Sequence, residues 1–177
     1  MSQELIFGYG SLLNLDSLKA TIADPGEIKA AYIRGFRRDF SLWDKQGFTD
    51  TNPAVANIPH CALDVQKGNA TAEVNGVCFA VNEDQFAKLL EREHDYELVK
   101  TMAYDFHTNE PIGACAFFSA HKHNGTYDFD NKAQQRYLEI CLEGAKEFGA
   151  AFYQTFLDTT YLGTTKLSEL PELLVSG

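Results

Sequence analysis

The chain is short of positive charge. It carries 15 Lys and Arg against 25 Asp and Glu in 177 residues, so its formal net charge at pH 7 is −10. Proteins that bind nucleic-acid phosphates need clustered Lys and Arg, and the densest basic run here extends only from Arg34 to Arg38. The composition therefore argues against a nucleic-acid partner and against docking on an anionic membrane.

Long apolar runs are also missing. No stretch approaches the ~18 consecutive apolar residues that a membrane-spanning helix requires, and Met1 to Glu4 lack the basic flank of a secretory signal. We therefore expect a cytoplasmic protein with no membrane partner.

Cysteine is scarce, and its spacing does not suggest a metal site. The four cysteines form no CxxC motif and no short Cys/His pair; they are Cys61, Cys78, Cys115 and Cys141. Zinc sites depend on such close ligand pairs, so we expect buried thiols and no metal. His121 and His123 alternate along the chain, but no acid or cysteine follows nearby, which favours a polar loop. We expect no cofactor, because neither a Walker A motif nor a GxGxxG fingerprint is present.

Aromatic residues, in contrast, are plentiful. The chain has 13 Phe, 8 Tyr and one Trp, and its hydrophobic share is 45%. This composition and length predict one folded domain over residues 1–177, with a frayed tail at 171–177. Whether the domain forms oligomers does not follow from the sequence.

The order of expected elements points to a fold class. Apolar alternation and turn residues predict strands at 5–7, in 31–43 as one long or two short strands, and at 62–65, 74–81, 96–106 and 112–120. Capping and periodicity predict helices from 14 to 22, from 82 onward and from 131 to 148, with a short element at 152–157. Strict alternation of strands and helices is absent. The sequence therefore predicts an α+β domain with a small mixed, barrel-like sheet and packed helices.

The first candidate site is the segment Phe7-Gly8-Tyr9-Gly10-Ser11-Leu12. Two glycines flank a tyrosine at the end of the first expected strand. Such a turn lets the backbone approach a ligand and exposes consecutive N–H groups that can hold a carboxylate. The alternative is an ordinary glycine turn with no ligand.

The second candidate is Glu93. If the helix from residue 82 continues this far, a rotation of about 100° per residue places Phe86, Leu89, Leu90 and Glu93 on one apolar stripe, whereas Glu91 points away. A carboxylate on that stripe is buried, and burial raises its pKa toward the range useful for general acid–base catalysis. Alternatively, the helix ends near Glu91 and Glu93 reaches solvent.

Three segments in this order resemble the gamma-glutamylcyclotransferase superfamily, which includes the glutathione-degrading ChaC branch. Residues 7–12 are similar to its N-terminal YGSL-type motif. Residues 91–96 are similar to the segment with a catalytic Glu and a Tyr three residues later. Residues 137–146 are similar to its late helix, in which a Tyr precedes Gly-Ala by seven residues. The resemblance extends over roughly residues 4 to 157.

The resemblance implies a reaction and a set of site residues. The α-amine of a γ-glutamyl group attacks its own γ-carbonyl, which gives 5-oxoproline and a released amino acid, peptide or amine. Glu93 is then the catalytic acid–base, and Tyr96 and Tyr137 bind the substrate. The turn residues that would hold the glutamyl carboxylate and carbonyl are Tyr9, Gly10, Ser11 and Leu12. The partner is a small γ-glutamyl molecule, and no metal or cofactor is required.

One departure from the family pattern affects the substrate. ChaC-like proteins commonly carry small residues between the Glu and the Tyr, whereas this chain has His94-Asp95. We expect this bulkier, charged pair to narrow the pocket or to raise the pKa of Glu93 further, which argues against a glutathione-specific enzyme. The late helix is closer to the branch that acts on γ-glutamyl amino acids. The alternative functions are a non-catalytic binding protein for small amino-acid-like anions and a protein-interaction module.

Overall fold

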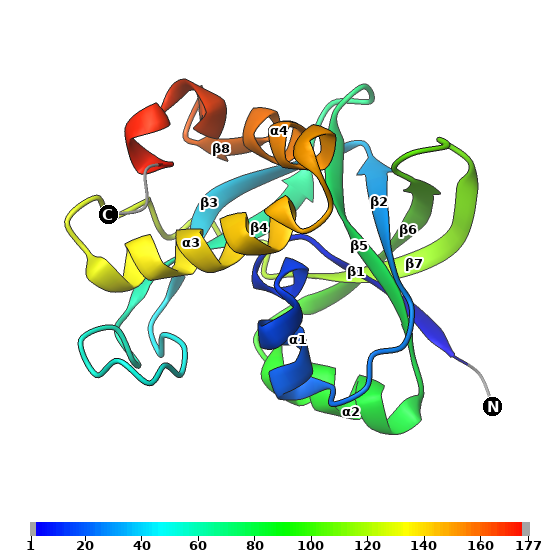
Figure 1. The fold of residues 1–177 in the computed structure, drawn as a ribbon, viewed down its shortest axis with the longest axis horizontal. Helices are drawn as coiled ribbons and strands as arrows, with labels where there is room; N and C mark the ends of the chain where they lie inside the picture. Colours follow the sequence, from blue (N-terminus) through cyan, green and yellow to red (C-terminus); the bar gives the residue numbers. More distant parts are fainter. Residues whose placement is uncertain (1–2, 175–177) are drawn as a thin grey trace.

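The computed structural model of the chain describes residues 3–174 (Figure 1). Five strands form a closed barrel in the order β1-β5-β2-β6-β7. Their bounds are Glu4–Gly8 (β1), Ile28–Arg34 (β2), Glu73–Val81 (β5), Glu97–Asp105 (β6) and Pro111–Ser119 (β7). Neighbouring strands are antiparallel except β1 and β7, which meet in parallel at Ile6 and Ala116 and close the barrel.

A second sheet of four strands lies beside the barrel, in the order β4-β3-β8-β9. Its strands are Phe36–Asp44 (β3), His60–Lys67 (β4), Thr160–Leu162 (β8) and Thr165–Lys166 (β9). The chain passes from barrel to second sheet at Gly35, whose φ of +83° is a left-handed conformation that glycine adopts without strain. This glycine divides the expected 31–43 segment into two strands that belong to different sheets.

Helices cover the barrel and the second sheet (Figure 1). The α-helices are Leu15–Thr21 (α1), Glu83–Arg92 (α2), Lys132–Lys146 (α3) and Ala150–Asp158 (α4), and short 3₁₀ helices occupy Ser11–Leu13 (η1), Leu167–Glu169 (η2) and Pro171–Leu173 (η3). The predicted α+β class with a small mixed, barrel-like sheet is confirmed. None of the helices in residues 3–174 has the length and apolar character that crossing a membrane requires.

Asparagine side chains begin three of these helices. Asn14 accepts hydrogen bonds from the amides of Asp16 and Ser17 at the start of α1. Asn82 forms a reciprocal capping box with Gln85 at the start of α2. Asn131 likewise accepts from the first amides of α3. Each cap satisfies N–H groups that have no partner within the helix. Because these interactions are local, the starts of these helices could be predicted from the sequence.

The helix α3 lies unusually close to the turn that follows β1. A Cβ atom added at Gly144 would stand 2.6 Å from the backbone of Leu13 and Asn14, so only glycine permits this approach. The Asn14 side chain also donates to the carbonyl of Ile140 at 3.0 Å. This contact brings Tyr137 of α3 beside the glycine turn of residues 7–12.

A fully buried arginine joins the barrel to the second sheet. The guanidinium of Arg38 donates to the Tyr9 carbonyl at 3.2 Å and to the Asn75 carbonyl and side chain at 2.6 and 2.8 Å. It also reaches the hydroxyls of Thr159 and Thr160, while among residues 3–174 no carboxylate pairs with it. Burial lowers its pKa to about 9. The charge is therefore kept at neutral pH and is compensated by neutral oxygens.

The C-terminal tail differs in part from the sequence prediction. Residues 171–173, predicted to fray, form the 3₁₀ helix η3 instead. Leu173 and Leu174 are partly buried against the hydrophobic core, which explains the order of this part. Residues 175–177 of the predicted tail lie outside the described residues.

Candidate functional site

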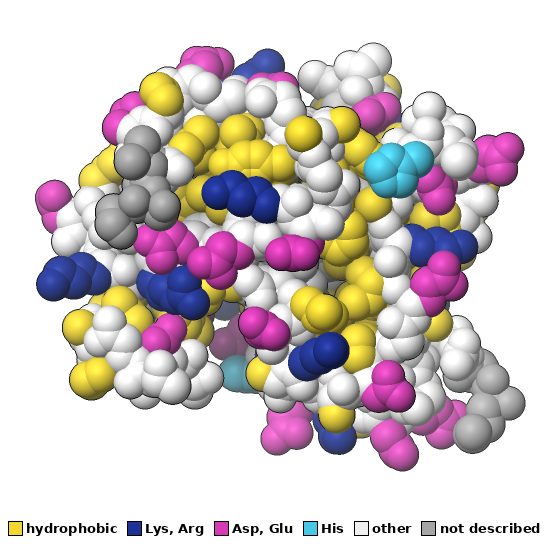
Figure 2. Space-filling model, viewed as in Figure 1, with side chains coloured by type: hydrophobic (Ala, Val, Ile, Leu, Met, Phe, Trp, Pro, Cys, Tyr) yellow, Lys and Arg dark blue, Asp and Glu magenta, His cyan; other side chains and the backbone are white. Residues whose placement is uncertain are grey.

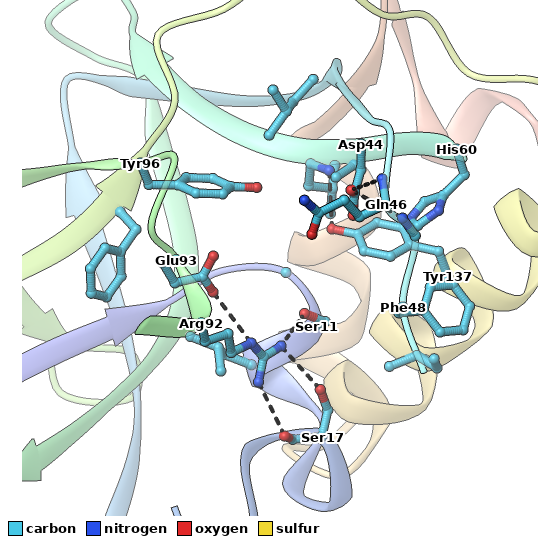
Figure 3. A pocket seen from close by; sticks show the side chains of 18 of the residues that line it. Ser11, Ser17, Asp44, Gln46, Phe48, His60, Arg92, Glu93, Tyr96 and Tyr137 are labelled. Carbon is cyan, nitrogen blue, oxygen red and sulfur yellow. Dashed lines mark hydrogen bonds and ion pairs between the residues drawn. The ribbon is translucent and has the colours of Figure 1, made fainter. Parts of the chain in front are cut away.

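A cavity of about 830 Å³ opens between the glycine turn, the end of α2, the loop after β3 and one face of α3 (Figure 3). All the residues that the sequence assigned to a site line this cavity. They are Tyr9, Gly10, Ser11, Leu12, Glu93, Tyr96 and Tyr137. The fold thus brings together three segments that lie far apart in the chain, at residues 9–12, 93–96 and 137.

The glycine turn lines the cavity with backbone N–H groups that are unpaired among residues 3–174. The carbonyls of Gly10 and Ser11 accept the bonds that form η1, but the N–H groups of Gly10, Ser11 and Leu12 donate to no residue in the described range 3–174. A Cβ at Gly10 would lie 3.2 Å from the Tyr137 hydroxyl, so glycine keeps this space open. Unpaired amides in a concave turn suit a carboxylate ligand.

Tyr9, in contrast, uses its polar atoms within the protein. Its hydroxyl donates to the Phe118 carbonyl and lies 3.4 Å from Oδ1 of Asp64, and its own carbonyl accepts from Arg38. Burial raises the pKa of the phenol well above its ordinary value. Tyr9 therefore faces the cavity with its ring and backbone rather than with a free hydroxyl.

Glu93 reaches the cavity by a route that differs from the predicted one. The helix α2 ends at Arg92, and Glu93 is its C-cap with φ −104° and ψ 37°. Leu90, placed on the buried stripe by periodicity, is 44% exposed, so the expectation of a continuous stripe was wrong. Leaving the helix turns the Glu93 side chain inward, where it is 16% exposed. The alternative of a solvent-facing Glu93 is also wrong, although Glu91 is exposed as expected.

Arg92 connects Glu93 to the glycine turn. Its Nε lies 3.4 Å from Oε1 of Glu93, and its Nη2 donates to the Ser11 hydroxyl at 3.0 Å (Figure 3). Its Nη1 donates to the Thr21 hydroxyl and the Ser17 carbonyl of α1. Arg92 is not among the site residues predicted from the sequence. Its hydrogen-bond partners in the turn and in α1 are 71 to 81 residues away in the chain, so no local pattern marks these contacts.

The environment of Glu93 favours a carboxyl that can both accept and donate a proton. Burial raises the pKa of Glu93, and the nearby charge of Asp44 acts in the same direction. The guanidinium of Arg92 opposes this shift without cancelling it. One carboxylate oxygen faces Arg92, and Figure 3 shows the other directed into the cavity. A raised pKa brings a carboxyl closer to the range in which general acid–base catalysis is efficient.

The two predicted tyrosines differ in how they are held. Tyr137 accepts a hydrogen bond from the Leu63 amide at 3.0 Å and packs against the buried His60, with ring centroids 5.0 Å apart and the rings tilted by 40°. Tyr96 follows the turn in which its amide donates to the Glu93 carbonyl. Its hydroxyl bonds to none of residues 3–174 and points across the cavity (Figure 3). Burial raises the pKa of both phenols, so both remain hydrogen-bond donors at neutral pH.

The pair His94-Asp95 does not raise the pKa of Glu93 as the sequence suggested. Both side chains are exposed, at 57% and 69%, and lie 3.3 Å apart. His94 lowers the pKa of Glu93 rather than raising it, because a positive charge on the imidazole would stabilise the carboxylate. The pair lies at the rim of the cavity.

The residues from 3 to 174 contain no group of three or more His, Cys, Asp or Glu side chains that could hold a metal ion. The four cysteines, all of which lie in this range, are buried free thiols, as the sequence predicted.

No protein-family model and no curated protein sequence matches the chain. Solved structures do. One described as a gamma-glutamyl cyclotransferase shares 19% identity over 98% of each chain, with a TM-score of 0.67. A human protein described as uncharacterized shares 17% sequence identity over 99% of this chain and 100% of its own chain, with a TM-score of 0.65. A structure described as a yeast gamma-glutamyl cyclotransferase specific to glutathione shares 13% sequence identity over 98% of this chain and 96% of the yeast chain, with a TM-score of 0.58. The chain therefore has the gamma-glutamyl cyclotransferase fold, and the resemblance drawn from its motifs is confirmed at that level.

The buried carboxylate gives a stability prediction with a definite sign. Because the folded-state pKa of Glu93 is raised, wild-type stability is lost as pH rises through that pKa. We expect Glu93→Gln to raise Tm at pH 8 by about 2–4 °C, the shift that about 1 kcal/mol produces in a chain of this size. At pH 4 the difference should shrink toward zero.

Thermal unfolding followed by circular dichroism at both pH values measures this difference. Glu91→Gln removes the same charge from an exposed residue of α2 and serves as the control. A lower Tm for Glu93→Gln at pH 8 would mean that the ion pair with Arg92 outweighs the cost of burial.

Proposed function

We propose that the protein is a cofactor-independent gamma-glutamyl cyclotransferase that converts a γ-glutamyl amino acid, peptide or amine into 5-oxoproline and the released amine. One observation carries the proposal. A buried carboxylate with one oxygen directed into the cavity shares that cavity with three unpaired amides, and Arg92 spans the gap between them. The shared fold of solved gamma-glutamyl cyclotransferases supports the same enzyme class.

Substrate binding follows from these two features. The amides of Gly10, Ser11 and Leu12 hold the α-carboxylate of the glutamyl group, and Glu93 faces its α-ammonium. Anchoring both groups of the α-carbon folds the side chain so that its γ-carbonyl approaches the α-nitrogen. The attack is intramolecular, so correct orientation supplies much of the rate acceleration.

Proton transfer is the task of Glu93. Its carboxylate takes a proton from the α-ammonium, and the free amine attacks the γ-carbonyl carbon to form the ring C–N bond. The same carboxyl returns a proton to the leaving nitrogen as the original amide C–N bond breaks. Overall the α-nitrogen loses two protons and the leaving nitrogen gains two, so no cofactor is consumed.

The tyrosines complete the site. The free hydroxyl of Tyr96 donates to the carbonyl oxygen as negative charge develops on it, which is the contribution of an oxyanion hole. Tyr137 is fixed by the Leu63 amide and shapes the cavity beside Gly10. The proposal retains the cytoplasmic location expected from the sequence and a small γ-glutamyl molecule as partner.

Removing the acid–base should abolish most turnover. We expect Glu93→Gln to reduce kcat/KM for 5-oxoproline formation by about 10²–10⁴-fold, the usual contribution of general acid–base catalysis. The rate is measured by mass spectrometry of the 5-oxoproline released from a panel of γ-glutamyl amino acids, peptides and amines. Glu91→Gln is the matched control and should retain wild-type rates. Wild-type turnover by Glu93→Gln, or no product from any compound with the wild-type protein, would contradict the proposal.

Arg92 should act through the pKa of Glu93. Its positive charge lowers that pKa, so Arg92→Met raises it further and leaves less carboxylate at a given pH. The acidic limb of the kcat/KM profile should therefore move to higher pH in Arg92→Met.

Arg92→Lys keeps the charge but lacks the planar fork that bridges Ser11 and α1. Its acidic limb should move less than that of Arg92→Met, even where its rate falls. If the acidic limb of the kcat/KM profile lies at the same pH in both variants, Arg92 acts only by holding α1 and Ser11 in place.

A further inference from the structure

A carboxylate at the glycine turn would bind in acidic surroundings. The chain has a formal net charge of −10 at pH 7, and Figure 2 shows acidic side chains gathered over α3, the helix that forms one wall of the cavity. Glu93 adds a carboxylate to the cavity lining. These charges repel an anion, whereas the N–H groups of the turn attract it only through partial charges. A positive charge placed close to the turn would therefore strengthen anion binding.

Arg38 contacts the turn from within the protein. It is fully buried, is not among the described residues that line the cavity, and donates from Nη1 to the Tyr9 carbonyl at 3.2 Å. The Tyr9–Gly10 peptide is trans, so its carbonyl and its N–H point to opposite sides. The unpaired N–H of Gly10 is therefore directed away from Arg38, and Gly10 itself lines the cavity. One peptide group thus connects the buried guanidinium to the cavity wall.

The position of this guanidinium is fixed by its remaining hydrogen bonds. Arg38 donates to the carbonyl and the side-chain oxygen of Asn75 at 2.6 and 2.8 Å. It also donates to the hydroxyls of Thr160 at 2.8 Å and Thr159 at 2.9 Å. The ring of Phe156 packs against its plane, with Cζ 4.1 Å from the ring centroid. The Tyr9 carbonyl is therefore held by a donor that has no freedom to move away.

The charge of Arg38 is not neutralised within the protein. Among residues 3–174 it forms an ion pair with no carboxylate, whereas Arg92 is paired with Glu93. Burial lowers the pKa of Arg38 only to about 9, so the charge is present at pH 7. A buried charge is screened less than a charge at the surface. A carbonyl that accepts from a cation is also polarised, which makes the N–H of the same peptide a stronger donor.

Two lysines also line the cavity and have to be distinguished from Arg38. Lys45 and Lys122 are exposed, and within the described range neither makes an ion pair. Water and salt screen such charges. Neither lysine donates a hydrogen bond to the turn, whereas Arg38 is bonded to its backbone.

We propose that Arg38 is a positioning residue of the anion site: it fixes and polarises the Tyr9–Gly10 peptide through the Tyr9 carbonyl, and its unpaired charge attracts the carboxylate of the ligand to the turn. The identity of that carboxylate, the α-carboxylate of a γ-glutamyl group, rests on the proposed function. Arg38 itself touches neither the substrate nor Glu93. Its effect reaches the ligand through one peptide group and through its electric field.

Two probes of the same shape measure the attraction for a carboxylate. They are 5-oxoproline and 5-oxoprolinamide, in which a neutral amide replaces the carboxylate. Titration of isotopically labelled wild-type protein, followed by NMR, gives the Kd of each probe from the amide resonances of residues 10–12. We expect 5-oxoproline to bind about tenfold tighter than 5-oxoprolinamide, as for charge-assisted hydrogen bonds.

A variant of a neighbouring residue neutralises Arg38 and leaves it in place. Replacing Arg38 itself would leave buried oxygens unpaired and destabilise the fold. Thr159→Asp instead puts a carboxylate at a half-buried position beside Nη2 of Arg38, and Thr159→Asn puts a neutral group of the same shape there. We expect Thr159→Asp to reduce the preference for 5-oxoproline over 5-oxoprolinamide by about fivefold and to leave binding of the amide nearly unchanged.

Two controls separate this effect from a structural defect and from net charge. Thr159→Asn should keep the wild-type preference, because it does not neutralise Arg38. Arg37→Gln makes the chain more negative by the same amount as Thr159→Asp, at a partly exposed neighbouring residue, and should also keep the preference. A structural defect would weaken the binding of both probes and would be expected in both Thr159 variants.

The outcomes distinguish this inference from the proposed function, because binding of the probes needs no turnover. If the wild-type protein releases no 5-oxoproline from any γ-glutamyl compound, the cyclotransferase proposal fails, and the inference stands where Thr159→Asp alone loses the preference for the carboxylate. The inference is overturned if the wild-type protein binds both probes equally or neither, or if Thr159→Asp keeps the preference. It is also overturned if Thr159→Asn or Arg37→Gln loses the preference to the same extent.

Discussion

The candidate site depends on the contacts of one guanidinium group. Arg92 binds Glu93 on one side and Ser11, Ser17 and Thr21 on the other, so the end of α2 is tied to α1 and to the glycine turn. Among residues 3–174, these contacts of Arg92 are the hydrogen bonds and the ion pair that hold the C-cap of α2 against the turn after β1. The same ion pair lowers the pKa of Glu93 against the larger effect of burial, so one residue influences both the position and the proton affinity of the acid.

Two ionisable side chains near the site, Arg38 and Glu93, are buried, and their burial opposes folding. Arg38 is fully buried and satisfied only by neutral oxygens, one of them the carbonyl of Tyr9 at the start of the turn. Glu93 is largely buried with one cationic partner. Burying such groups opposes folding unless they are hydrogen-bonded, and proteins tolerate this where it positions reactive groups. In this fold the polar network around the turn offsets that cost.

Local signals were enough to predict most elements, and the motif resemblance named residues that line one cavity. Asn14, Asn82 and Asn131 mark helix starts because capping is a short-range interaction. The inward position of Glu93 was predicted for an incorrect reason. Periodicity assumed a continuous helix, whereas the helix ends at Arg92 and the C-cap conformation turns the side chain inward.

The remaining features depend on contacts between distant segments. Closure of the barrel through β1 and β7, the roles of Arg92 and Arg38, and the position of Asp44 have no counterpart in a local pattern. Gly144 was noted only as part of a motif, and its close approach to residues 13 and 14 becomes visible only when α3 is placed on η1.

In the proposed reaction, one ligand contacts both the glycine turn and the acid at position 93. A crystal structure of the Glu93→Gln protein with an intact γ-glutamyl compound addresses this claim most directly. The account predicts the α-carboxylate on the amides of Gly10 to Leu12 and the α-nitrogen within hydrogen-bonding distance of the side chain at position 93. A compound bound outside the cavity, or one with its α-nitrogen directed away from that side chain, would contradict it.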